Sequence, residues 1–338
     1  MKHGANIYKY AKKLGCHSGE IIDFSSNINL YRPEISLKIT PSLLATYPDS
    51  NYTELKRIIA SNYGLKKSQI ALFNGATSAI FELFRMLKQK NVFLYAPLYG
   101  EYEKAAFQTK KNIYKINRIS EIEEEVEEKS IVVFVNPATP EGTHYNLEKL
   151  FSYWVEQKCT IILDESFIEF EALASLKEKI KEYKKLYIIQ SFSKFYASAG
   201  IRVGAIFSQK QNIAKLQTPL WNISALDELF LKQRLSDEAF KEETKKLHLK
   251  QKKELFTILE NSQIFEEVVK SGANFILAYT PKGKELFKYL LEQKILIRLC
   301  GSFDYLDNNW IRFGVKATKE HQKLQEALES FYEKISLS

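Results

Sequence analysis

The sequence has few cysteines, and their number and positions exclude two kinds of site. Cys16, Cys159 and Cys300 are the only three in 338 residues, and they lie far apart in the chain. An odd number of widely separated cysteines provides neither a disulfide framework nor the spacing of a metal site, and it fits a reducing compartment. A cytoplasmic protein without a bound metal is therefore expected.

Long apolar runs and an apolar leader are missing as well. No run approaches the roughly 20 residues that a membrane span requires, and Met1-Lys2-His3-Gly4 leads into polar chain rather than into a signal core. The strings G-x-G-x-x-G and G-x-x-x-x-G-K-[ST] do not occur, which argues against nucleotide-binding folds. The net charge of +8 is spread along the chain rather than clustered in a basic stripe, so neither nucleic acid nor a membrane is expected as a partner.

What is present is an alternation of apolar runs and helical patterns between about residues 50 and 240. Hydrophobic residues make up 45% of the chain and aromatic residues 13%, which is a globular composition. Near-continuous apolar strands are typical of a sheet buried on both faces, so an α/β fold with a mainly parallel sheet flanked by helices is predicted. Ligands of such sheets bind beyond the carboxyl ends of the strands. The expected elements are strands at Ile70–Phe73, Val92–Tyr95, Ile131–Val135, Thr160–Leu163, Leu186–Gln190 and Val203–Phe207, and a helix at Ser78–Leu87.

The C-terminal part has a different pattern. Long helices are expected over about residues 236–260 and 319–334, with strands at Asn274–Ala278, Ile295–Leu299 and Trp310–Val315. These elements predict a smaller α+β domain, made of residues 1–47 and 241–338, beside a large domain of residues 48–240. The acidic stretch of residues 121–128 is expected to be a solvated helix face.

The segment Ser191–Arg202 contains the strongest functional signal. It begins where a predicted strand ends, and it places the hydroxyls of Ser191 and Ser193 beside Lys194, with Arg202 eight residues further on. Hydroxyls and a guanidinium are suitable donors for a phosphate dianion, and a lysine beside them can form a Schiff base with an aldehyde. A lysine alone would be read as a surface residue in so Lys-rich a chain; the combination predicts a cofactor anchor.

Other strand ends carry weaker signals. The apolar strand Thr160–Leu163 leads into Asp164, which could pair with a ring nitrogen of the cofactor or be an ordinary strand-end charge. The turn Asn74–Ser78 offers backbone N–H groups to a phosphate at a helix start, although an ordinary strand–helix turn has the same appearance. Tyr99 could stack on a planar ring or belong to the core. Asn136–Gly142 is a rigid turn that presents polar groups at the sheet edge.

Taken in this order, the segments resemble the aspartate-aminotransferase superfamily of fold-type I pyridoxal-phosphate enzymes, from residue 3 to about 316. The chain is most similar to the branch with threonine-phosphate decarboxylase and histidinol-phosphate aminotransferase. His3–Tyr8 resembles the decarboxylase's H-G-G-N segment, and Asp23–Asn29 resembles its D-F-S-A-N-I-N segment. Two further segments, Trp221–Leu226 and Arg298–Phe303, also resemble that subfamily. The resemblance implies a seven-stranded type of sheet, pyridoxal 5′-phosphate as cofactor, and a homodimer with shared active sites.

The resemblance also implies a role for each residue at a matching position. Lys194 would be the Schiff-base lysine, Asp164 the partner of the ring nitrogen, and Tyr99 the residue stacked on the ring. The cofactor phosphate would be held by Gly75, Ala76, Thr77, Ser191, Ser193 and Arg202, and by Tyr47 reaching across from the neighbouring subunit. Arg312 would bind the substrate carboxylate. The far anionic end of the substrate would be bound by His3, Asn27 and Arg298.

Two departures from the family pattern concern the ring hydroxyl of the cofactor. The turn usually reads N-P-x-N-P-T-G, and here Thr139 stands where an asparagine donates to the ring hydroxyl. Phe167 replaces a tyrosine that many aminotransferases add at the same oxygen. The hydroxyl of Thr139 could substitute for the asparagine, and Phe167 is compatible with the decarboxylase side of the branch.

Three functions are compatible with these observations. The first choice is decarboxylation of O-phospho-L-serine or O-phospho-L-threonine, to ethanolamine phosphate or 1-aminopropan-2-yl phosphate. One methyl group, about 1–3 kcal/mol in a pocket, does not decide between these substrates. The second choice is an aminotransferase of the histidinol-phosphate type. The third, a catalytically silent binding or regulatory protein, is disfavoured because Lys194, Asp164 and Arg202 are all present.

Overall fold

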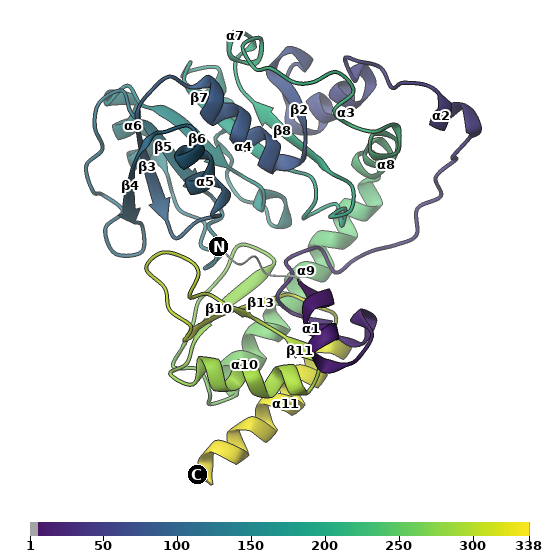
Figure 1. Cartoon of the computed structure of the whole chain (residues 1–338), viewed down its shortest axis with the longest axis vertical. Helices are drawn as coiled ribbons and strands as arrows, with labels where there is room; N and C mark the ends of the chain where they lie inside the picture. The colour runs from purple at the N-terminus through teal and green to yellow at the C-terminus, as the bar shows by residue number, and fades with distance from the viewer. Residues whose placement is uncertain (1–5, 338) are drawn as a thin grey trace.

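A seven-stranded sheet lies at the centre of the upper part of the molecule (Figure 1). The structure, a computed structural model, describes residues 6–337. Strand β8 runs antiparallel to both of its neighbours, and the other neighbouring pairs are parallel. The predicted α/β fold with a mainly parallel sheet is therefore confirmed. In their order across the sheet the strands are β2 (Ile70–Asn74), β8 (Val203–Phe207), β7 (Leu186–Ser191), β6 (Thr160–Asp164), β5 (Ile131–Val135), β3 (Asn91–Ala96) and β4 (Asn112–Asn117).

Strand β4 is not among the strands that the sequence predicts. It pairs with β3 at the edge of the sheet, and most of its residues are exposed or half-buried. An edge strand that is only partly covered needs no continuous apolar run. Its sequence, Asn-Ile-Tyr-Lys-Ile-Asn, therefore lacks the pattern of the buried strands.

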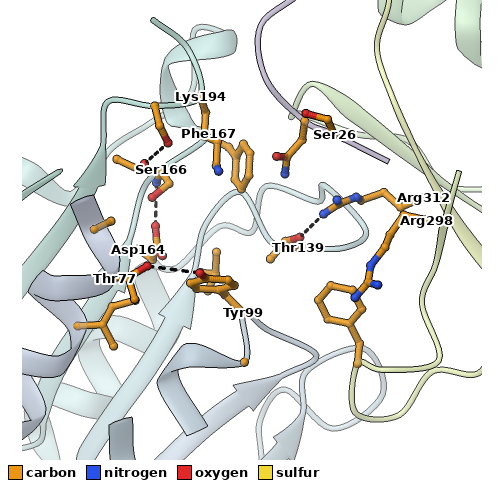
Figure 2. A pocket seen from close by; sticks show the side chains of 18 of the residues that line it. Ser26, Thr77, Tyr99, Thr139, Asp164, Ser166, Phe167, Lys194, Arg298 and Arg312 are labelled. Atoms are coloured by element: carbon orange, nitrogen blue, oxygen red, sulfur yellow. Dashed lines mark hydrogen bonds between the residues drawn. The ribbon is translucent and has the colours of Figure 1, made fainter. Parts of the chain in front are cut away.

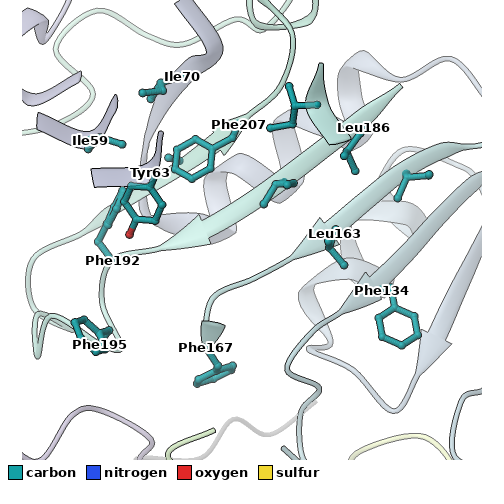
Figure 3. Packing of buried hydrophobic residues seen from close by; sticks show 14 of the residues in the cluster. Ile59, Tyr63, Ile70, Phe134, Leu163, Phe167, Leu186, Phe192, Phe195 and Phe207 are labelled. Carbon is teal, nitrogen blue, oxygen red and sulfur yellow. The ribbon is translucent and has the colours of Figure 1, made fainter. Parts of the chain in front are cut away.

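The buried strands supply side chains to both faces of this sheet. In β6, Ile161 and Leu163 belong to a core on one face, whereas Ile162 belongs to a second core on the other. Successive side chains of a strand point to opposite faces, which explains why these runs are apolar throughout. Figure 3 shows the first core, where the rings of Tyr63 and Phe207 have centroids 5.2 Å apart. The first core is covered by α3 (Thr53–Tyr63), α6 (Glu148–Glu156) and α8 (Ala225–Leu235), and the second by α4 (Gly75–Met86) and α5 (Glu101–Gln108).

The lower part of the molecule contains an antiparallel four-stranded sheet in the order β12-β13-β10-β9 (Figure 1). Its helices and strands form a third core, which also includes Phe24 from the N-terminal segment. Within residues 6–337, no helix is long and apolar enough to cross a membrane. The elements are α9 (Glu238–Asn261), β9 (Glu267–Val268), β10 (Phe275–Tyr279), α10 (Gly283–Glu292), β12 (Arg298–Leu299), β13 (Trp310–Gly314) and α11 (Thr318–Ser336).

The N-terminal segment packs on this lower part. The predicted strand Ile295–Leu299 is in fact two short strands, because its two ends pair in different sheets. Strand β11 (Ile295–Leu296) pairs in parallel with β1 (Ile22–Asp23), while β12 pairs with β13. Helix α1 (Ile7–Leu14) shares a small core with α10 and β11. The division into residues 48–240, and 1–47 with 241–338, stays a prediction.

The helix expected for the acidic stretch of residues 121–128 is wrong, since the stretch consists of turns and irregular chain. Glutamates four positions apart, such as Glu121 and Glu125, repel each other on a helix. The stretch contains no basic residue that could compensate. Glu128 pairs instead with Lys158, with 2.7 Å between Oε1 and Nζ.

The start of α4 packs directly on β8, and this contact requires a glycine. A Cβ atom on Gly204 would lie 2.3 Å from the backbone nitrogen of Ala76. Backbone cannot move aside as a flexible side chain can, so the absence of a Cβ allows the first turn of α4 to approach the sheet. That turn carries Ala76 and Thr77, two of the predicted phosphate-binding residues.

We expect Gly204→Ala to lower the free energy of unfolding by about 1–3 kcal/mol, the usual cost of overpacking a core, because the first turn of α4 must shift. The matched control is Gly200→Ala, at an exposed position where an added Cβ meets no atom within 4 Å. This control should change the stability by no more than about 0.5 kcal/mol. Urea unfolding measures both variants, and equal stabilities would contradict the close approach.

Candidate active site

A cavity of about 270 Å³ lies between the seven-stranded and the four-stranded sheet (Figure 2). The parallel strands end at this edge and the antiparallel β8 begins there, so loops that are far apart in the sequence meet. Strands β12 and β13 line the opposite side. The cavity brings together most of the predicted site residues, namely Asn27, Ala76, Thr77, Tyr99, Thr139, Asp164, Phe167, Ser191, Ser193, Lys194, Arg202, Arg298 and Arg312.

One end of the cavity has hydroxyl groups, a helix start and a guanidinium. Gly75 begins α4 with a φ of +78°, a conformation that favours glycine. A Cβ at this position would lie 2.9 Å from Nη2 of Arg202. Ser191 Oγ and Ser193 Oγ lie 2.8 Å apart. Backbone N–H groups at a helix start, hydroxyls and a guanidinium together favour an anion with several oxygens, such as a phosphate.

Lys194 follows β7 by three residues and lines the cavity (Figure 2). Burial lowers the pKa of Lys194 to about 8, the positive charges of Arg312 and Arg202 contribute to this decrease, and Asp164 opposes it. About a tenth of amines with such a pKa are neutral at pH 7, far more than for an ordinary lysine. A neutral amine is the form that attacks an aldehyde.

Asp164 ends β6 and is the only carboxylate among the described residues that line the cavity. The Tyr102 hydroxyl donates to its Oδ2 over 2.7 Å, and the Ser166 backbone N–H donates to its Oδ1 over 2.9 Å. Burial raises the pKa of Asp164 above its usual value, and the hydrogen bonds from Ser166 and Tyr102 oppose that rise. A carboxylate held in this way can pair with an N–H group of a bound molecule.

Two aromatic side chains provide flat walls between these groups. Tyr99 lies with its hydroxyl 3.3 Å from Thr77 Oγ1, and burial raises its pKa. Phe167 is buried and packs edge-on against Phe275, with ring centroids 5.1 Å apart. The face of an aromatic side chain can stack on a planar ring of a ligand. Phe167 has no polar group and therefore cannot form a hydrogen bond with that ligand.

Two arginines of the four-stranded sheet form the opposite wall. Arg298 on β12 and Arg312 on β13 are directly opposite each other in the strand pairing. Arg312 donates from Nη1 to Thr139 Oγ1 over 3.3 Å and from Nη2 to the Ser25 carbonyl over 3.0 Å. Its buried Nε has no partner among the described residues. Arg298 donates from Nη2 to the Ser302 hydroxyl over 2.6 Å.

Neither of these arginines is paired with a carboxylate from residues 6–337. Burial lowers the pKa of Arg312 to about 10 and also lowers that of Arg298. Both nevertheless remain protonated at neutral pH. Buried charges are costly unless they are paired, so two adjacent guanidiniums without carboxylates are suited to a ligand with two anionic groups.

Three predicted residues do not line the cavity within the described chain. Tyr47 is 74% exposed and stacks on Trp221, with ring centroids 4.2 Å apart. Gly75 lies beside the cavity, next to Arg202, and acts through its backbone conformation. His3 lies outside the described residues.

Sequence reasoning missed several residues of the site. Ser25 and Ser26 line the cavity and lie inside the Asp23–Asn29 segment, and Ser166, which also lines it, follows Asp164 closely. Their nearness in the sequence to predicted site residues could therefore have indicated all three. Phe303 also lines the cavity. Tyr102 had no such signal, because its contact with Asp164 joins two separate elements.

The donor groups fit a phosphorylated aldehyde that has a ring nitrogen. The hydroxyls and Arg202 suit its phosphate, the Lys194 amine its aldehyde, and Asp164 its ring nitrogen, with Tyr99 available to stack on the ring. In the part of the chain that the structure describes, no group of three or more His, Cys, Asp or Glu residues could hold a metal ion.

Comparison with known proteins gives similarities over nearly the whole chain. Residues 19–331 match the family described as aminotransferase class I and II. The chain is 31% identical to the adenosylcobalamin biosynthesis bifunctional protein CobDQ of Leptospira interrogans, over 98% of this chain but only 41% of that longer protein. It is 25% identical to threonine-phosphate decarboxylase of Salmonella typhimurium, over 96% of this chain and 95% of that protein. The crystal structure of histidinol-phosphate aminotransferase from Clostridium acetobutylicum has 32% identity and a TM-score of 0.81, and covers 93% of this chain and 100% of that one.

The relatives include proteins named for two different reactions, decarboxylation and amino transfer. Their common fold agrees with the seven-stranded sheet and with the cavity at its edge. The chain therefore belongs to the class I and II aminotransferase family, whose cofactor is pyridoxal 5′-phosphate.

Proposed function

We propose that Lys194 binds pyridoxal 5′-phosphate covalently and that the cavity around it is the active site. When bound, this cofactor withdraws electrons from the bonds at the substrate Cα. The lowered pKa of Lys194 and the buried carboxylate of Asp164 support this assignment. Asp164 would keep the ring nitrogen protonated and Tyr99 would stack on the ring. The phosphate would be held by Gly75, Ala76, Thr77, Ser191, Ser193 and Arg202.

The proposed substrate is a small O-phospho-amino acid. The observation that carries this proposal is the adjacent pair of Arg298 and Arg312, which lack carboxylate partners in the described chain. Arg312 would bind the carboxylate, and Arg298, with Asn27 and His3, would bind the phosphate. O-phospho-L-serine and O-phospho-L-threonine carry both anionic groups on one short molecule.

The proposed reaction is decarboxylation. By holding the two ends of the substrate, Arg312 and Arg298 determine which bond at Cα is aligned for cleavage. Loss of the carboxylate as CO₂ leaves an electron pair at Cα, which then takes up one proton. Lys194 faces the cavity and, when its amine is not bound to the cofactor, would supply that proton as a general acid. The product is ethanolamine phosphate or 1-aminopropan-2-yl phosphate.

A histidinol-phosphate aminotransferase is the second candidate. The 32% identity to the Clostridium acetobutylicum structure favours it, and its substrate also carries a phosphate that Arg298 could bind. Phe167, which offers no hydrogen bond to the cofactor oxygen, favours the decarboxylase instead. Thr139 lines the cavity with a hydroxyl that could replace the usual asparagine. A catalytically silent protein remains the third and least favoured candidate.

We also infer a homodimer with shared active sites, in a cytoplasm where its three free cysteines stay reduced. The segment around α2 (Pro41–Ala45) runs along the outside of the molecule (Figure 1). Its Leu44 and Tyr47 are exposed, as are Leu220 and Trp221, and Tyr47 stacks on Trp221. Exposed apolar side chains that gather in this way mark an interaction surface. Tyr47 would reach the cofactor phosphate of the neighbouring subunit.

We expect the purified protein to release CO₂ from O-phospho-L-serine or O-phospho-L-threonine, and Arg298→Ala to reduce kcat/KM for them by about tenfold or more. A hydrogen bond to a charged group contributes about 1.5–3 kcal/mol, and 1.4 kcal/mol is a factor of ten. The loss should be much smaller with L-serine, which has no phosphate. Assays of CO₂ and of the phosphorylated amine measure both substrates.

The control is Arg57→Ala, which removes an exposed arginine paired with Glu54 and should change kcat/KM by no more than about twofold. Equal losses on phosphorylated and unphosphorylated serine would give Arg298 a structural role. Transamination of histidinol phosphate, without CO₂ from either phospho-amino acid, would favour the second candidate.

We expect the apoprotein to capture pyridoxal 5′-phosphate at a rate that rises with pH through a midpoint near 8, because only the neutral Lys194 amine reacts. An ordinary lysine would give a midpoint near its usual pKa of 10.5. The growth of the visible absorption band measures the rate.

Lys194→Ala should give no borohydride-reducible adduct with the cofactor. Lys252→Ala should still give one, although burial also lowers the pKa of Lys252 to about 8. A reducible adduct at another lysine of Lys194→Ala would contradict the assignment.

We expect mixed dimers of Tyr47→Ala and Lys194→Ala subunits to regain activity, provided that each variant is severely impaired alone. In a shared site, one of the two sites combines the intact Lys194 of one subunit with the intact Tyr47 of the other. Steady-state turnover after subunit exchange measures the recovery. The control is Tyr114→Ala, another exposed tyrosine stacked on an aromatic ring, which should remain active alone. No recovery in demonstrated mixed dimers would count against shared sites.

A further inference from the structure

A buried ion pair supports the turn that carries Thr139. Arg118, just after β4, is 1% exposed, and Glu141, in the turn after β5, is 4% exposed. The Arg118 Nε donates to Oε1 of Glu141 over 2.7 Å, and Nη2 donates to Oε2 over 2.8 Å. Such a two-bond contact between planar groups fixes the orientation of both side chains.

The same two side chains also bind the chain around them. The Arg118 Nη1 donates to the Tyr95 carbonyl over 2.6 Å, and Nη2 donates to the Thr139 carbonyl over 2.9 Å. The Tyr145 hydroxyl donates to Oε1 of Glu141 over 3.3 Å. The turn is thus tied to β3 on one side and to the chain that follows it on the other, which leaves Thr139 little freedom.

Thr139 in turn contacts the arginine that we assign to the substrate carboxylate. Its Oγ1 accepts from Nη1 of Arg312, and the Ser25 carbonyl accepts from Nη2. These two bonds hold two corners of the guanidinium plane, while the buried Nε has no partner in the described chain. The direction in which the guanidinium faces therefore depends on Thr139 and Ser25.

We propose that the Arg118–Glu141 pair positions Arg312. It fixes the carbonyl of Thr139 and, through the backbone, its hydroxyl, which orients the guanidinium toward the substrate carboxylate. Neither Arg118 nor Glu141 lines the cavity, so both act on the substrate only through Thr139. The inference rests on the proposed function, in which Arg312 binds that carboxylate. Thr139 and Glu141 are also the positions at which this turn differs from the N-P-x-N-P-T-G pattern.

If the pair had a purely structural role, its loss would not selectively weaken the binding of a carboxylate. Replacing a buried ion pair by apolar side chains of similar volume often leaves stability unchanged or raises it. A double apolar variant can therefore fold and still lack the bond to the Thr139 carbonyl. Stability and carboxylate recognition are separable in such a variant.

The test measures the binding of two unreactive probes to the holoenzyme by calorimetry. The first probe, 3-(phosphonooxy)propanoate, is O-phosphoserine without its amino group, and the second, ethyl phosphate, lacks the carboxylate as well. In the Arg118→Met, Glu141→Leu double variant, binding of the first probe should weaken by about fivefold or more, and that of ethyl phosphate by no more than about twofold. Thr139→Val should show the same selective loss, and Thr139→Ser, which keeps the hydroxyl, should not.

The matched control is Arg57→Met, Glu54→Leu, which removes a two-bond pair of the same residue types from the surface. It should leave both affinities unchanged. Circular dichroism and the visible absorption band verify that each variant is folded and loaded with cofactor. Should the buried double variant not fold, Thr139→Val and Thr139→Ser decide the question.

Unchanged affinity of folded Thr139→Val for 3-(phosphonooxy)propanoate would overturn the inference, and so would equal weakening of both probes. If Arg298 does not bind a substrate phosphate, the result is different, because the wild-type protein would then bind neither phosphorylated probe. In that case propanoate, which has the carboxylate alone, replaces the first probe. Weaker binding of propanoate by Thr139→Val than by Thr139→Ser would still support the positioning of Arg312.

Discussion

Positive charge concentrated at one cavity is the constraint on which the rest of the site depends. Lys194, Arg202, Arg298 and Arg312 all line it, and Asp164 is the one carboxylate among the described lining residues. Like charges in a poorly solvated site are costly. Burial and the neighbouring arginines therefore lower the pKa of Lys194, and burial lowers that of Arg312. Anionic ligands offset this cost, so the cavity suits a phosphorylated cofactor and a substrate with two anionic groups.

These charges come from two sheets, and buried contacts position parts of the site around them. Lys194 and Arg202 lie in the loop between β7 and β8, whereas Arg298 and Arg312 lie on neighbouring strands of the other sheet. Close packing at Gly204 sets the start of α4, and the turn carrying Thr139 holds one side of Arg312. The relative position of the two sheets thus sets the distance between cofactor and substrate, and such distances decide which bond reacts.

Much of the fold could be predicted because buried strands have a local signature. A strand covered on both faces is almost continuously apolar, and Thr160–Leu163 is recognisable by that property alone. Strand β4 has no such signature because it lies at an edge. Ile295–Leu299 has the pattern of a single strand, but its two ends pair in different sheets. The acidic stretch of residues 121–128 has the composition of a solvated helix, but its charges repel one another on a helix.

The sequence by itself determined the fold class and the candidate cofactor anchor, because the strand patterns and the Ser191–Arg202 segment are each contained in a short stretch of chain. Only the tertiary structure decided which distant groups support that anchor. Tyr102 and Asp164 are 62 positions apart, and Arg118 and Glu141 are 23 apart. No local pattern encodes such a meeting, since it depends on how strands are ordered across a sheet and how two sheets face each other. For the same physical reason, only the structure shows that no carboxylate of the described chain forms an ion pair with Arg298 or Arg312.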